Sequence, residues 1–287
     1  MEPMRHGLVR YVGVVFAVGI PAMFLISCQN AFVYHPTRAG EQALLEQAEQ
    51  AGFTPWPQAG EDRIGWRAAP EPPAPDPQSS RDKEPARALV FHGNAGHSLH
   101  REYLARGLQS AERGPGWDVH LFEYPGYGSR DGTPGEETIM NAAAEALETL
   151  LAEDEQRPVY LVGESLGSGV AAALAARFPE HVPAVLLITP FTNLEDVGAA
   201  MVPRPLVRLI LRDRYDAKAA LETYDGRVGV LIAGEDEVVT PELGTRLYES
   251  YDGEKRKWVQ QDASHNTLDY TPGSPFWDEL TDFLLGH

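Results

Sequence analysis

The spacing of short apolar runs along the chain most strongly limits the folds open to it. Five runs contain no Asp, Glu, Lys or Arg, as is typical of strands buried on both faces of a parallel sheet. They occupy residues 88–91, 119–122, 159–162, 184–188 and 228–232. Helical patterns lie between or after them, at residues 99–112, 136–153, 166–178, 241–251 and 276–285. This alternation predicts an α/β fold, a mostly parallel sheet with right-handed crossovers and helices on both faces.

The length of the chain suits one such domain. With 287 residues, 43% of them hydrophobic, the chain can bury a sizeable core, and we expect a single α/β domain at residues 29–287. Residues 70–85 contain six prolines, which lack the donor that a sheet needs, so we expect an exposed hairpin tip there. Residues 192–221 exceed a plain crossover and predict a short helical cap. Its most apolar part, 202–211, either guides acyl chains or packs over the sheet.

The first 28 residues have the pattern of an export or anchoring segment. Arg5 and Arg10 precede a stretch, 11–37, that has no Asp, Glu, Lys or Arg. A basic start followed by an apolar run is typical of a signal peptide. The run ends in Leu-Ile-Ser-Cys and thereby resembles a bacterial lipoprotein signal, in which Cys28 would be lipidated.

The same apolar run supports a second interpretation. Its length is just sufficient to span ~30 Å of hydrocarbon as an uncleaved helix, and cleavage to a soluble form is a third outcome. We expect a membrane-associated protein that contacts the membrane through its N-terminal segment. An exported lipoprotein is our prediction, and a single-pass membrane anchor is the alternative.

Charge and cysteine content exclude several classes of partner. The formal net charge is −18, so the surface would repel phosphates; we expect no nucleic-acid partner, and we do not expect anionic lipid to be the main partner. Cys28 is the only cysteine, which excludes an intramolecular disulfide and a zinc site built on several thiolates. We expect neither a metal nor an organic cofactor.

A pentapeptide with the pattern G-x-S-x-G carries the chemistry. It runs from Gly163 to Gly167 with Ser165 at its centre, and it follows a predicted strand and precedes an Ala-rich helix. This is the nucleophile elbow, in which serine sits on a strained strand-to-helix turn. The flanking glycines allow the strand and the helix to approach each other. The helix N-terminus also favours negative charge beside the serine oxygen.

A serine hydroxyl is a weak nucleophile unless a base activates it. In folds built around this elbow, the acid and then the histidine follow the serine in chain order. Asp236 comes just after a predicted strand, and His265 comes after a plausible last strand. Glu235 and Glu237 flank the aspartate and compete for its role, but we expect the turn to direct only Asp236 to the site.

An oxyanion hole requires two backbone N–H donors. One is expected from Leu166, the residue after the nucleophile. The second is expected from Asn94, in the loop His-Gly-Asn-Ala-Gly that follows the strand at 88–91. His92 in this loop is interpreted as a bracing residue and not as a second base.

These motifs together resemble the α/β-hydrolase superfamily. Within it, the chain is most similar to membrane-tethered serine hydrolases of the serine aminopeptidase-like and depalmitoylase-like types. The segments that carry the resemblance are 32–36, 92–96, 124–128, 163–167, 234–236 and 264–265. The resemblance implies the α/β-hydrolase fold, a Ser-Asp-His triad and no cofactor. Two residues depart from the family pattern. Arg130 follows the Gly-Tyr-Gly turn, where such proteins often have a serine, and it could alter the rim of the pocket. Gly229 replaces the proline that often opens the strand before the acid.

The predicted reaction is acyl transfer to water. Ser165 attacks a carboxylic ester or thioester, His265 takes its proton, Asp236 orients the imidazole, and water releases the acyl group. The substrate is expected to be a small-molecule or lipid-like acyl compound. Alternatives are a peptidase or amidase of the same fold, and a catalytically silent binding module tethered to the membrane.

Overall fold

The computed structural model describes residues 30–57, 63–70 and 84–287. The predicted signal or anchor segment, including Cys28, and most of the proline-rich stretch lie outside the described residues. Within the described part of the chain, no helix has both the length and the apolar character needed to cross a membrane.

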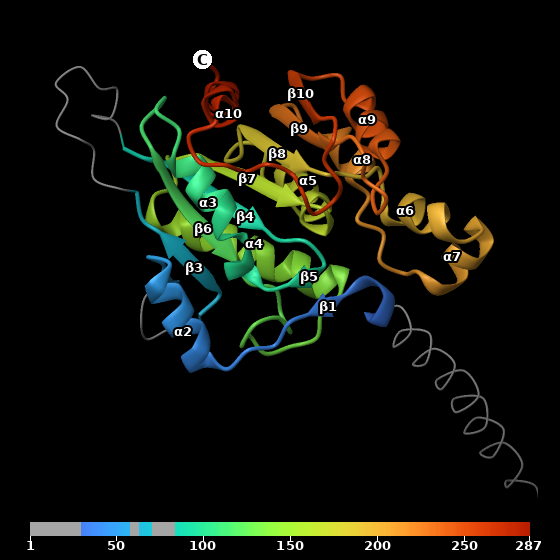
Figure 1. Ribbon diagram of the computed structural model, residues 1–287, viewed down its shortest axis with the longest axis horizontal. Coiled ribbons are helices and arrows are strands. Elements are labelled where there is room, and N and C mark those ends of the chain that lie inside the picture. The colour runs from blue at the N-terminus through green and yellow to red at the C-terminus, as the bar shows by residue number, and fades with distance from the viewer. Residues whose placement is uncertain (1–29, 58–62, 71–83) are drawn as a thin grey trace, which may run out of the picture.

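An eight-stranded sheet forms the centre of the molecule (Figure 1). Its strand order is β10-β9-β8-β7-β4-β6-β3-β2, and only the pairings of β3 with β2 and β6 are antiparallel. The predicted α/β-hydrolase fold with a mostly parallel sheet is therefore confirmed. The strands are β2 (Thr54–Trp56), β3 (Gly65–Ala68), β4 (Ala86–Phe91), β6 (Trp117–Phe122), β7 (Val159–Glu164), β8 (Ala184–Ile188), β9 (Arg227–Ala233) and β10 (Lys255–Gln260).

Helices cover both faces of this sheet. Successive side chains of a strand point to opposite faces, so Leu89 and Phe91 of β4 join one core cluster while Ala88 and Val90 join the other. The first cluster includes residues of α4 (Glu136–Glu153), α5 (Leu166–Arg177), α8 (Ala217–Leu221) and α9 (Pro241–Ser250). The second includes residues of α2 (Glu41–Gln50), α3 (Glu102–Gln109) and α10 (Pro275–Leu285).

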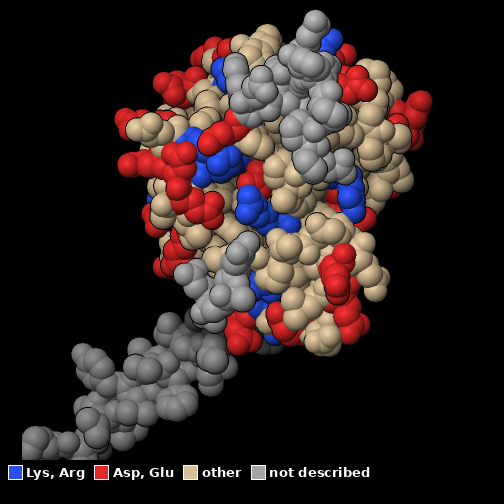
Figure 2. Space-filling model, turned by 90° about the vertical axis from the view of Figure 1, so that its left-hand side faces the viewer, with Lys and Arg blue, Asp and Glu red and all other residues tan. Residues whose placement is uncertain are grey.

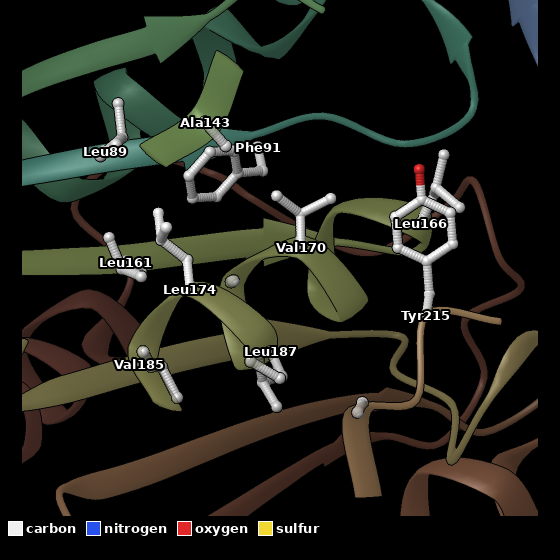
Figure 3. Packing of buried hydrophobic residues seen from close by; sticks show 14 of the residues in the cluster. Leu89, Phe91, Ala143, Leu161, Leu166, Val170, Leu174, Val185, Leu187 and Tyr215 are labelled. Carbon is white, nitrogen blue, oxygen red and sulfur yellow. The ribbon is translucent and has the colours of Figure 1, made fainter. Parts of the chain in front are cut away.

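The first core cluster packs against the helix that follows the G-x-S-x-G turn. Figure 3 shows Phe91 and Leu161 of the strands facing Val170 and Leu174 of α5. These side chains are fully buried. Because α5 begins at Leu166, directly after the predicted nucleophile, this packing fixes the helix that follows Ser165.

The strands on either side of the proline-rich stretch are not paired with each other. β3 precedes the stretch and β4 follows it, but β6 lies between them in the sheet. The prediction of a hairpin tip at residues 70–85 is therefore wrong. The antiparallel strand β3 docks on β6 instead, and residues 71–83 themselves lie outside the described residues.

A second, two-stranded sheet was not predicted. β1 (His35–Pro36) pairs in parallel with β5 (Ala95–Gly96), with His35 opposite Ala95. The first described residues of the chain thus run beside the loop that follows β4 (Figure 1). Strands of two residues carry no periodic signal, so sequence patterns could not reveal this pairing.

Three helices connect β8 to β9, namely α6 (Leu194–Met201), α7 (Arg204–Ile210) and α8. We call α6 and α7 the projecting pair, because they extend beyond the carboxyl ends of the strands (Figure 1). Val207 is buried, but Met201 is 76% exposed and Leu209 is 66% exposed. The apolar side chains around α7 therefore do not simply pack over the sheet.

The acidic composition is visible on the surface. Figure 2 shows acidic side chains spread around one face of the molecule, with basic side chains confined to a few small groups. This distribution agrees with the net charge of −18 and offers no broad basic surface on this face.

Candidate active site

Ser165 lies at the turn between β7 and α5 in a strained conformation. Its φ of 52° and ψ of −117° fall outside the regions that L-residues favour. The Ser165 N–H donates to the carbonyl of Ile188 at 2.9 Å, which ties the turn to the adjacent strand β8. Strain of this kind persists only where the surrounding structure enforces it.

The two elbow glycines are required by close backbone contacts. A Cβ at Gly163 would lie 2.1 Å from the carbonyl oxygen of Gly167. A Cβ at Gly167 would lie 2.2 Å from the carbonyl oxygen of Phe91. The glycines therefore allow the strands and the helix to approach each other, as the motif predicts. β4, β7 and α5 leave no room for side chains at these two positions.

The structure brings Ser165, His265 and Asp236 together. Nε2 of His265 lies 3.1 Å from Oγ of Ser165, and Nδ1 lies 2.7 Å from Oδ2 of Asp236. His265 is 100 residues from the serine and 29 from the aspartate. A nucleophile, a base and an orienting acid within hydrogen-bond reach are the arrangement that activates a serine hydroxyl.

Asp236 is distinguished from its neighbours by burial. The backbone N–H groups of Val238 and Val239 both donate to its Oδ1 at 2.8 Å, which leaves Oδ2 for the imidazole. Glu235 and Glu237 are exposed, whereas Asp236 is only 4% exposed. The turn after β9 thus directs one of the three acids to His265, as expected.

The loop after β4 passes directly beside Ser165. A Cβ at Gly93 would lie 3.5 Å from Cβ of Ser165. Leu166 is the first residue of α5, and the first N–H groups of a helix have no partner within the helix. The predicted donors Leu166 and Asn94 therefore lie on two segments that flank the serine.

Distant residues hold this loop in place. The carbonyl of Asn94 accepts from the N–H of His35 at 2.9 Å and from the hydroxyl of Tyr127 at 2.7 Å. The Asn94 side chain donates to the carbonyl of Val33 at 3.0 Å. His92 is buried, and its Nδ1 donates to the carbonyl of Gly93, so it braces the loop as expected.

A buried ion pair next to the elbow was missed in the sequence. Nε of Arg101 lies 2.7 Å from Oε2 of Glu164, and the hydroxyl of Tyr103 donates to Oε1 of Glu164 at 2.5 Å. Arg101 also donates to the carbonyl of Ala95 at 3.1 Å. Arg101 thus links the residue before Ser165 to the loop after β4.

The charge of this ion pair is stabilised by its partners. Burial by itself would raise the pKa of Glu164, but the Arg101 guanidinium and the Tyr103 hydroxyl outweigh it and lower that pKa. The signal in the sequence was a carboxylate between a buried strand and a serine, where an unpaired charge would be very costly. A buried carboxylate at that point predicts a cationic partner from elsewhere in the chain.

Arg130 contacts the end of β6 and the residue that follows it. Its guanidinium donates to the carbonyl of Glu123 at 2.6 Å and stacks over Phe122 at 5.2 Å. The residue therefore supports the turn after β6. Within the described residues, no group of three or more His, Cys, Asp and Glu side chains could hold a metal ion.

Comparison with known proteins identifies the family to which the chain belongs. The family described as alpha/beta hydrolase fold matches residues 89–220. An uncharacterized protein of Mycobacterium tuberculosis (strain ATCC 25618 / H37Rv) is 33% identical over 267 residues, covering 91% of this chain and 89% of that protein. This chain belongs to the α/β-hydrolase superfamily. The narrower likeness to aminopeptidase-like and depalmitoylase-like members stays a prediction.

Two further relatives and one solved structure are also similar to this α/β hydrolase. Protein bem46 of Schizosaccharomyces pombe is 26% identical over 213 residues, covering 72% of this chain and 70% of that protein. The lysophosphatidylserine lipase ABHD12 of Danio rerio is 28% identical over 247 residues, covering 76% and 63%. The esterase Pf2001 of Pyrococcus furiosus shares the fold with a TM-score of 0.63 at 15% identity, covering 88% of this chain and 97% of the esterase.

Proposed function

We propose that this α/β hydrolase cleaves carboxylic ester or thioester bonds with Ser165 as the nucleophile. The observation that carries the proposal is the unbroken hydrogen-bonded series from Ser165 through His265 to Asp236. A strained serine on the elbow and an aspartate held by two backbone N–H groups add support. The similarity to a lysophosphatidylserine lipase and the fold of esterases favour ester bonds over amide bonds.

The mechanism follows from this arrangement. His265 accepts the proton of Ser165 through Nε2 as the serine oxygen attacks the carbonyl carbon. Asp236 accepts from Nδ1, which selects the tautomer with a free Nε2 and stabilises the imidazolium. The imidazolium protonates the leaving alcohol or thiol, and an acyl-enzyme results. Water, activated by the same imidazole, then releases the acid.

The negative charge on the substrate oxygen needs donors that are already in place. The backbone N–H groups of Leu166 and Asn94 are proposed to supply them, from the helix start and from the braced loop. Donors held rigidly before the reaction avoid the reorganisation that water would require. The bonds from His35 and Tyr127 to Asn94 give the loop this rigidity.

A covalent probe tests the proposal. A fluorophosphonate should label the wild-type protein at Ser165, and Ser165→Ala should remove both the labelling and the hydrolysis of p-nitrophenyl esters. A series of ester chain lengths beside a panel of aminoacyl amides then separates an esterase from a peptidase. Hydrolysis by Ser165→Ala at the wild-type rate would refute the proposal, and a folded protein that takes up no probe would indicate a silent binding module.

The N-terminal segment is proposed to attach the protein to a membrane, with Cys28 as the lipidated residue. The absence of charged side chains from residue 11 to residue 37 supports attachment. Mass measurement of wild type and Cys28→Ala distinguishes the two forms of attachment. A mass difference equal to the side-chain change alone, with both proteins in the membrane fraction, would indicate a single-pass anchor.

A further inference from the structure

We infer that the projecting pair of helices docks on a lipid bilayer through an apolar patch beside α7. The patch consists of Met201, Val202, Leu206 and Leu209, which are 76%, 39%, 45% and 66% exposed. This inference concerns a surface and does not depend on the chemistry at Ser165. The occupant is the membrane surface itself and not a second protein.

The patch exists because α7 turns only one side toward the protein. Val207 packs against Gly198 of α6, where an added Cβ would lie 2.9 Å from the valine side chain. Leu209 lies on the opposite side of α7, two residues along the helix, and Leu206 lies near it. Apolar side chains gathered on the outer side of a short helix are unusual on a protein of net charge −18.

The segment that carries the patch is basic, in contrast to the chain as a whole. Residues 201–212 contain Arg204, Arg208 and Arg212 and no acidic residue. Arg204 and Arg208 contact Glu195, and Arg204 also contacts Asp196 at 2.5 Å, yet their side chains are still 50% and 64% exposed. Apolar side chains next to arginines are typical of segments that lie in the interface of a membrane with anionic lipids.

The position of the first described residues favours the bilayer as occupant. The hydroxyl of Tyr34 donates to Asp213, just after α7, at 2.5 Å, and lies 3.0 Å from the hydroxyl of Tyr215. The described chain therefore begins beside the projecting pair, as Figure 1 also shows. Phe32, two residues before Tyr34, is 74% exposed. Tyr34, inside the uncharged stretch 11–37, thus lies beside the segment that follows α7.

A second copy of the chain fits the patch less well. A symmetric contact would place the arginines of one copy near those of the other, and both copies carry a net charge of −18. A bilayer containing anionic lipid offers acyl chains to Leu206 and Leu209 and phosphates to the arginines. The acyl chains match the apolar side chains of the patch, and the phosphates match the arginines beside it.

Quenching by brominated lipid tests this inference on the full chain. Cys28→Ser leaves no cysteine, and Leu209→Cys then carries a single environment-sensitive fluorophore. The protein is reconstituted into vesicles of phosphatidylcholine and phosphatidylglycerol, with or without bromine on the acyl chains. We expect bromine to reduce the emission at position 209 by about half, because quenching requires contact at acyl-chain depth.

Val259→Cys in the same background is the matched control. Val259 is an exposed apolar residue on the edge strand β10, outside the patch, and its label should keep its emission. A second variant, Met201→Ser with Leu206→Ser, should weaken the quenching at position 209. Hydrolysis of p-nitrophenyl acetate by each labelled protein is measured separately, so a loss of activity reports on the proposed function and not on the patch.

The possible results decide between occupants. Quenching at position 209 with none at position 259 supports docking on lipid. Equal quenching at both positions, or none at position 209 in the chains that float with the vesicles, overturns it. A shift in emission at position 209 that grows with the protein-to-lipid ratio but ignores bromine indicates a second copy, and also overturns it.

Discussion

The two segments that flank Ser165 are held by different parts of the molecule. The elbow is fixed locally, by the contacts of Gly163 and Gly167 with backbone atoms of β4 and α5. The loop after β4 is fixed from outside, by β1, by Tyr127 and by Arg101. The geometry of Ser165, the proposed nucleophile, thus depends on packing within the sheet, whereas the proposed oxyanion donor at Asn94 depends on residues far away in sequence.

Substitution at the elbow should have the largest effect. In Gly167→Ala, the added Cβ would meet the Phe91 carbonyl oxygen at 2.2 Å and the His92 carbonyl oxygen at 2.8 Å, and these backbone atoms leave no room to adjust. We expect a destabilisation of about 3–5 kcal/mol with loss of activity, measured by urea unfolding. Gly40→Ala is the control, because nothing lies within 4 Å of its added Cβ. Equal stability of the two variants would show that the elbow tolerates a side chain.

Asp236→Asn should remove activity and leave the fold intact. The amide would favour the wrong imidazole tautomer, and we expect kcat to fall by about 10⁴-fold. Ester hydrolysis and thermal unfolding measure the two effects. Glu237→Gln, one residue away and exposed, should be close to wild type. If the two variants lost the same activity, the assignment of the acid would be incorrect.

A fall in pH should destabilise the region around the loop after β4 before it affects the elbow. Burial, with a further contribution from nearby His100, lowers the pKa of His97 to about 4. Because this value lies below the unfolded value of 6.5, the stabilisation from neutral His97 is complete above pH 6.5 and is lost as the pH falls towards 4. At pH 4 the loss is at most about 3 kcal/mol.

His97→Gln tests this pH dependence. The variant should lose less stability than wild type between pH 7.5 and 4.5, as measured by thermal unfolding at a series of pH values. His287→Gln, at the exposed C-terminus, should follow the wild-type curve. Parallel curves for wild type and His97→Gln would rule out His97 as the source of acid sensitivity.

Removing the link between the two segments should have the smallest effect. Arg101→Met by itself leaves Glu164 buried and unpaired, so we combine it with Glu164→Gln, which removes both charges. We expect kcat to fall about 10-fold with KM nearly unchanged, because the loop loses its bond at Ala95 while the elbow stays packed.

A purely structural role for the pair would give a different result. Unfolding temperature would then fall in the double variant, while the rate of fluorophosphonate labelling per folded molecule would match that of wild type. Arg101→Lys, which keeps the charge but not the planar fork, should give an intermediate kcat. Its kcat would equal that of the double variant if charge made no contribution.

Much of the fold was predictable from local pattern. The runs at residues 159–162 and 184–188 became β7 and β8, and the helix predicted at 136–153 has those bounds in the structure. Periodicity predicts such elements because burial on one or both faces dictates which positions are apolar. The hairpin expected at residues 70–85 was wrong, because which strands pair is decided by long-range docking and not by the connecting residues.

The sequence by itself determined the elbow and the order of Ser165, Asp236 and His265, since close backbone contacts require glycines and the order is a property of the chain. Tertiary structure alone decided the rest: that Arg101 pairs with Glu164, that His35 holds Asn94, and that Leu209 faces outward. These contacts join residues far apart in sequence or depend on which side of a helix is covered. Local patterns carry no information about either, because only the packed chain brings such partners together.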